Sequence, residues 1–146
     1  MLNHILVPLD GSKLSETALD HAKNLVAAGG KITLLRVVEA GVLVARLQQR
    51  TDDPEKLDKH ARRAAKEYLL GFASELSKDG KQAEVEVREG KPADVIVKAA
   101  EELSADAIVI STHGRTGITR LVVGSVTQDV INTANCLIIV VPNTSS

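Results

Sequence analysis

Residues 111–125, STHGRTGITRLVVGS, have the composition of a phosphate-binding surface. They contain five Ser or Thr side chains, and nine residues separate Gly114 from Gly124. Ser125 follows at a predicted helix start, where unpaired backbone N–H groups and the positive end of the helix dipole bind anions. Gly124 would let a phosphate approach the backbone, the Ser125 hydroxyl could donate to it, and Arg115 supplies a nearby guanidinium. The segment therefore predicts an anion site.

The same residues admit a structural interpretation. Gly114 could simply shape a loop, and Ser125 with Gln128 has the spacing of a capping box at the start of a helix. The chain contains neither the G-x-x-x-x-G-K-[ST] pattern of P-loop proteins nor the G-x-G-x-x-G fingerprint of dinucleotide sites. Capping and phosphate binding can alternate at one hydroxyl, so both interpretations stay open at this point.

A second polar segment, PLDGS at residues 8–12, follows an apolar run near the start of the chain. The carboxylate of Asp10, or the neighbouring backbone, could hydrogen-bond the exocyclic amine or a ring nitrogen of a base. The structural alternative is a turn in which Ser12 caps the next helix. If both polar segments lie on the same edge of one sheet, a shared ligand is favoured.

The elements that must position these segments follow from the spacing of apolar residues. Short, mostly β-branched runs predict strands at residues 4–9, 31–38, 83–89, 106–111 and 136–141. Apolar residues at steps of three and four predict helices at residues 13–28, 54–79, 92–103 and 125–134. We expect Gly29 and Gly30 to end the first helix. The run 83–89 alternates, which predicts an edge strand or one with a wetter face.

The alternation of strands and helices predicts an α/β protein with a doubly wound, five-stranded parallel sheet. In such sheets, ligands bind at the carboxyl ends of the strands, where the strand order reverses. The loops that carry Asp10 and Ser111 follow the first and fourth predicted strands and are therefore the first candidates. Residues 39–53 are long for a simple connection, and they could form a helical turn, a lid over the site or part of a partner surface.

The composition limits the function. With 146 residues, 44% hydrophobic and 25% charged, the chain suits one globular domain spanning residues 1–146. A net charge of -1 does not attract nucleic acid, and an aromatic content of 1% provides no platform for stacking bases. The single cysteine, Cys136, excludes an intramolecular disulfide and fits a reducing cytoplasm. No apolar run has the length of a membrane span, and we expect no membrane association.

The whole chain resembles the universal stress protein family. The resemblance rests on ILVPLDGS and SETAL near the start, GKPAD at residues 90–94, and STHGRTGITRLVVGS. ATP-binding members of that family are similar to a G-x-x-G-x9-G-[ST] pattern. The matching positions here are Ser111, Gly114, Gly124 and Ser125, so that a serine replaces the first glycine. The resemblance implies a Rossmann-like sheet of the adenine nucleotide alpha hydrolase type, with strand order 3-2-1-4-5.

The resemblance also implies an ATP site with two ends. The residues that would border the adenine are Pro8, Asp10 and Val37. Those that would lie by the ribose and the phosphates are Ser111, Gly114, Gly124, Ser125 and Val126. Mg²⁺ would be held chiefly by phosphate oxygens, because the motif offers no carboxylate ligand. Family members commonly dimerise through the last strand, here residues 136–142, which implies a homodimer.

The function that follows is a small cytoplasmic ATP-binding protein of the stress response. Its nucleotide-bound state would be sensed by an unknown protein partner, with little or no ATP hydrolysis. Hydrolysis needs a positioned base or a water-orienting group, and the sequence offers charge-neutralising groups but no obvious base. The alternatives are a slow ATPase and a dimeric adaptor that does not bind nucleotide.

Overall fold

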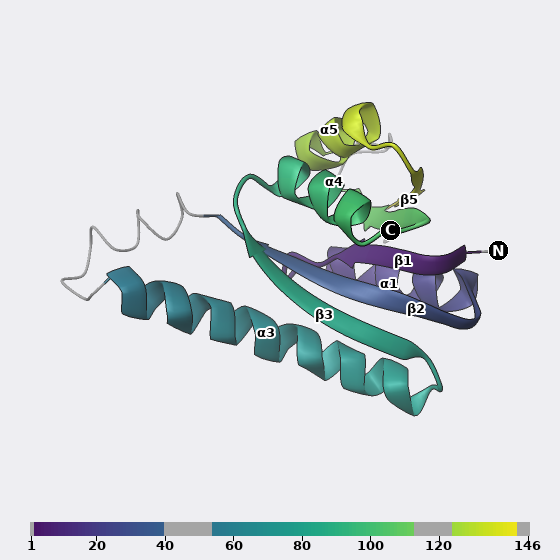
Figure 1. The fold of residues 1–146 in the computed structure, drawn as a ribbon, viewed down its shortest axis with the longest axis horizontal. Coiled ribbons are helices and arrows are strands. Elements are labelled where there is room, and N and C mark those ends of the chain that lie inside the picture. The colour runs from purple at the N-terminus through teal and green to yellow at the C-terminus, as the bar shows by residue number, and fades with distance from the viewer. Residues whose placement is uncertain (1, 40–53, 113–123, 143–146) are drawn as a thin grey trace.

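The computed structural model describes residues 2–39, 54–112 and 124–142, which form a parallel sheet with helices on both faces (Figure 1). The strands are β1 (Leu2–Pro8), β2 (Val26–Val38), β3 (Gln82–Glu89), β4 (Ala107–Ser111) and β5 (Leu137–Val141). The helices are α1 (Lys13–Leu25), α3 (Pro54–Lys78), α4 (Pro92–Glu102) and α5 (Ser125–Thr133). The strand order is β3-β2-β1-β4-β5, so the predicted fold class and strand order are confirmed.

Two hydrophobic clusters cover the two faces of the sheet. Figure 1 shows α4 and α5 together on one side and α3 along β3 on the other. On β1, Ile5 packs into the cluster shared with α1 and α3, whereas Leu6 packs into the cluster shared with α4 and α5. Neither side chain exposes any surface. Burial on both faces explains why the central strands are nearly continuous apolar runs.

The first helix is shorter than the sequence predicted. It ends at Leu25, and Val26 already has an extended backbone with φ -72° and ψ 137°. Val26 and Ala27 then belong to β2, and each is only 8% exposed. The prediction that Gly29 and Gly30 end the helix was wrong, because Val26 and Ala27 before them are buried in a strand rather than on a helix face.

The other elements follow the sequence more closely. Apart from the start of β2, each begins and ends within two residues of its predicted bounds. β3, which has the alternating pattern, is an edge strand of the sheet, as expected. Of residues 39–53, only Glu39 belongs to the described part of the chain. In the described ranges, none of the helices is long and apolar enough to cross a bilayer.

Candidate functional site

A cavity of about 650 Å³ lies at the carboxyl ends of the central strands. It is lined by the turn after β1, the ends of β2 and β4, one face of α3 and the first turns of α4 and α5. β1 pairs with β2 on one side and with β4 on the other, so the strand order reverses here. This is the position at which open α/β sheets bind ligands, and the volume suits a small molecule.

The turn after β1 is fixed by its own polar side chains. Ser12 is the N-cap of α1, and its Oγ accepts a hydrogen bond from the Ser15 backbone N–H at 3.1 Å. Oδ1 of Asp10 accepts from the Ser12 backbone N–H at 2.9 Å and from the Ser12 hydroxyl. Gly11 between them has a φ of +90°, in the region that favours glycine. The structural interpretation of PLDGS is therefore confirmed, and the turn also presents Asp10, exposed, at the wall of the cavity.

Val126 and Thr127, in the first turn of α5, form another part of the cavity wall. The N-cap of this helix is Gly124, and no side chain caps its described first turn. The predicted capping box was wrong, because Ser125 is already the first helical residue and Gln128 donates instead to the Asn132 side chain at 3.2 Å. The N–H groups at the start of α5 therefore keep their capacity to bind an anion.

A buried hydrogen bond joins α5 to the end of β4. The Thr127 hydroxyl donates to the Ser111 backbone carbonyl at 3.2 Å. Thr127 is 1% exposed and Ser111 is 9% exposed. This bond fixes the start of α5 relative to the carboxyl end of β4. Both residues also line the cavity.

The predicted site residues fall into three groups. The cavity is lined by Pro8, Asp10, Val37, Ser111 and Val126. Gly124 and Ser125 directly precede Val126 at the start of α5 but are not among the lining residues. Gly114 and Arg115 lie outside the described residues. The structure thus brings five of the nine predicted residues to one cavity.

Sequence reasoning missed the wall that α3 contributes. Ala61, Ala64, Ala65 and Tyr68 line the cavity from this helix, and Arg36 lines it from β2. Two signals could have drawn attention to this wall. Arg36 is the one charged residue within ITLLRVV at positions 32–38, and Tyr68 is one of only two aromatic residues in the chain.

Arg36 and Tyr68 contact each other. The central carbon of the Arg36 guanidinium lies 5.6 Å from the centroid of the Tyr68 ring, and Nη1 donates to the Leu9 carbonyl at 3.4 Å. The Tyr68 hydroxyl donates to Glu16 at 2.7 Å. Burial of the ring raises the pKa of Tyr68 above its ordinary value, and the hydrogen bond to Glu16 makes a second, smaller contribution. The phenol therefore stays protonated at neutral pH.

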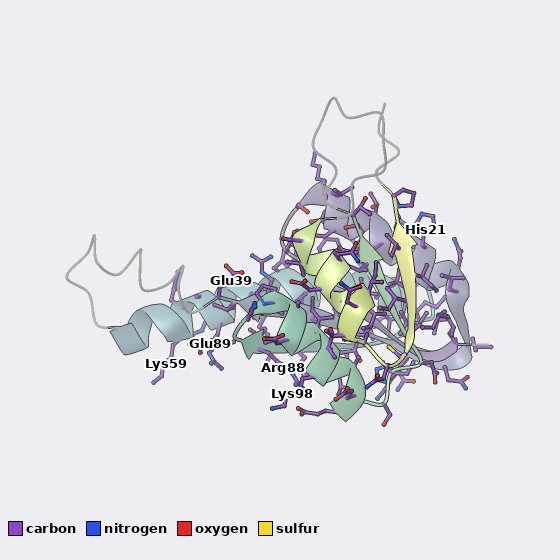
Figure 2. The ribbon with its side chains drawn as sticks, turned by 90° about the horizontal axis from the view of Figure 1, so that it is seen from above. His21, Glu39, Lys59, Arg88, Glu89 and Lys98 are labelled. Carbon is purple, nitrogen blue, oxygen red and sulfur yellow. The ribbon has the colours of Figure 1, made fainter. Side chains whose placement is uncertain are left out.

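The charged residues among the described lining of the cavity are Asp10, Arg36 and Glu39. Glu39 follows β2, and Figure 2 shows it at the same end of the molecule as Glu89, which ends β3. No His, Cys or Lys occurs among the described lining residues. In the same part of the chain, no cluster of His, Cys, Asp or Glu could hold a metal ion.

Comparison with known proteins identifies a family, related sequences and similar structures. The model of the universal stress protein family matches residues 1–142. Universal stress protein MJ0531 of Methanocaldococcus jannaschii is 32% identical over 94% of this chain and 80% of its own length. The structure of MJ0577, from the same organism, is similar with a TM-score of 0.83 and 28% identity, over 99% of this chain and 98% of that one. A universal stress protein of Archaeoglobus fulgidus in complex with dAMP has a TM-score of 0.64 and 26% identity, over 96% of this chain and 97% of that one.

Proposed function

The chain belongs to the universal stress protein family, and from this premise we propose that it is a small ATP-binding regulatory protein of the stress response. A protein partner would sense whether nucleotide is bound, and ATP would be hydrolysed slowly or not at all. We place this activity in the cytoplasm, in keeping with a chain that has a single cysteine.

The main support for the proposal is that one cavity offers groups for both a nucleotide base and its phosphates. Asp10, from the turn after β1, offers a carboxylate for a base, and α5 offers uncapped N–H groups for phosphates. The A. fulgidus relative in complex with dAMP supports an adenine nucleotide as the ligand. A volume of about 650 Å³ suits a ligand of this size.

The proposed roles combine the family resemblance with the positions of the described residues. Pro8 and Val37 would pack against the faces of the adenine, while Asp10 or its neighbouring backbone would bond the base edge. Ser111 would lie by the ribose, and the start of α5 would hold the terminal phosphates with the Ser125 hydroxyl. Gly114 and Arg115, together with Gly124 and Val126, would complete the phosphate end. Mg²⁺ would be bound chiefly by phosphate oxygens, where it would neutralise their charge.

Slow hydrolysis follows from the groups available. A general base near neutral pH must be able to take up a proton. Oδ1 of Asp10 already accepts two hydrogen bonds from Ser12, so this oxygen is engaged within the turn. Tyr68 has a raised pKa and keeps its proton. Neither residue is suited to activate a water molecule.

The test is mass spectrometry of the denatured, purified protein for retained ATP, ADP or AMP, followed by calorimetry with ATP and Mg²⁺. We expect Asp10→Ala to weaken ATP binding about tenfold, the loss of a hydrogen bond to a charged group. Asp129→Ala is the matched control, because Asp129 is an exposed acid on α5 that does not line the cavity. Absence of binding by the unaltered protein at millimolar ATP would refute the proposed function and favour a nucleotide-free adaptor.

We also propose that the protein forms a homodimer through residues 136–142. β5 is an edge strand, and Leu137 at its start is 54% exposed. An apolar edge strand invites pairing with a second copy. Leu137→Lys should shift the protein toward monomer in light scattering, whereas Leu70→Lys, at an exposed leucine of α3, should not. Equal behaviour of the two variants would exclude this interface.

A further inference from the structure

Arg36 lies between α3 and the turn that carries Asp10. On one side its guanidinium faces the Tyr68 ring, with 5.6 Å between the central carbon and the ring centroid. On the other side it lies against the turn, where a Cβ added to Gly11 would be 3.2 Å from Nη1 and 3.4 Å from Nη2. The guanidinium is therefore layered between an aromatic ring and a peptide backbone, an arrangement suited to its planar shape.

Tyr68 is itself held in place from two directions. Its hydroxyl donates to Oε2 of Glu16 at 2.7 Å, which anchors it to the first turn of α1. Its ring packs edge-on against Phe72, with centroids 5.2 Å apart and an angle of 75° between the planes. The aromatic surface under Arg36 is thus fixed relative to both α1 and α3.

Arg36 supplements the hydrogen bonds that the turn makes within itself. Gly11, with a φ of +90°, is the most flexible residue type, and it separates Asp10 from the Ser12 cap. Arg36 contacts this turn twice, because Nη1 also donates to the Leu9 carbonyl at 3.4 Å. A shift of the guanidinium would therefore move the residues on both sides of Asp10.

We propose that Arg36 and Tyr68 are positioning residues that hold the Asp10 turn in the geometry that recognises the base, so that α3 is coupled to the bound nucleotide. This inference rests on the proposed function. It assigns to the α3 wall a role in selecting the base, which goes beyond binding the nucleotide. It also provides a route by which a partner that contacts α3 could alter nucleotide affinity, since α3 holds the Tyr68 ring.

The test compares ATP with ITP, whose hypoxanthine carries a carbonyl oxygen where adenine carries an amine. We expect the unaltered protein to prefer ATP by about tenfold, because a carboxylate pairs with the amine and repels the carbonyl oxygen. Arg36→Met and Tyr68→Leu should each weaken ATP binding about fivefold and move the ATP-to-ITP affinity ratio toward one. Arg63→Met, at an exposed arginine of α3, is the matched control and should leave the ratio unchanged.

Two milder variants separate positioning from general stability. Arg36→Lys keeps a cation over the ring, and Tyr68→Phe keeps the ring but loses the bond to Glu16, so both should retain most of the preference. They also serve if a larger change prevents folding, which circular dichroism would reveal. A preference for ATP that persists in Arg36→Met and Tyr68→Leu would overturn the inference, as would an unaltered protein that binds both nucleotides equally. An unaltered protein that binds neither refutes the proposed function instead.

Discussion

Replacing Gly11 with alanine tests the contact between Arg36 and the Asp10 turn in the absence of any ligand. The φ of Gly11 is +90°, so an alanine there is strained by about 1–2 kcal/mol. The new Cβ would also lie 3.2 Å from Nη1 of Arg36, which must shift. Weakening the contact with the Tyr68 ring and the bond to the Leu9 carbonyl adds about 0.5–1 kcal/mol. We therefore expect Gly11→Ala to lower the free energy of unfolding by about 1.5–3 kcal/mol.

The chain provides its own control at Gly29. Its φ is +81°, close to that of Gly11, but a Cβ added to Gly29 would meet nothing within 4 Å. Gly29→Ala should therefore show the backbone strain alone, and the effect of alanine on the unfolded chain is the same at both positions. The difference between the two variants, measured by urea denaturation, isolates the contact with Arg36.

A double-mutant cycle then assigns the difference to one side chain. In an Arg36→Ala background, the extra destabilisation caused by Gly11→Ala over Gly29→Ala should disappear. The reasoning is refuted if Gly11→Ala destabilises no more than Gly29→Ala. It is also refuted if the extra loss persists when Arg36 is absent, because the new Cβ would then be meeting something else.

Three further predictions concern the fold. Burial lowers the pKa of His4 below 6.5, so the folded protein favours the neutral ring; stability should fall as the pH drops below about 6.5, by at most about 1.4 kcal/mol per pH unit. Urea denaturation between pH 7.5 and 5.5 should show a smaller change for His4→Gln. Gly30→Ala should destabilise by about 2–3 kcal/mol, because its Cβ would lie 2.7 Å from the Asn3 carbonyl oxygen; thermal denaturation that matches the unaltered protein would contradict this. Thr127→Val should lower the free energy of unfolding by about 1–2 kcal/mol, because it removes the bond to Ser111. Thr127→Ser keeps the hydroxyl and should retain most of this stability in the same urea assay.

The sheet could be predicted because its central strands are buried on both faces. A strand such as β4, with every residue buried, leaves a continuous apolar run that no other element of similar length explains. The bounds of α1 could not be predicted in the same way. Val26 continues the apolar spacing of the helix, but it pairs with Leu2 of β1 and, with Ala27, belongs to β2. That pairing depends on residues far away in the sequence.

The candidate site likewise has a part that the sequence predicts and a part that it does not. Asp10 and Ser111 could be predicted because Asp10 follows and Ser111 ends a recognisable strand, and parallel strands bring their carboxyl ends to one side of the sheet. The α3 wall could not, because its contact with the cavity depends on how a long helix crosses the sheet. Tyr68 lies 58 residues beyond Asp10 in the sequence, yet both line one cavity. Nothing local to either residue encodes that proximity.

The two edges of the sheet differ in a way that limits how copies of the chain can assemble. β3 carries ionised side chains, with Glu84 paired to Lys31 at 3.3 Å and Glu86 to Arg88 at 3.1 Å. A strand approaching this edge would have to displace water from these ions. β5 at the opposite edge, LIIVV, has no charged residue. A molecule with only one permissive edge can add only one neighbour along the sheet, so such pairing ends at two chains and does not propagate into a fibre.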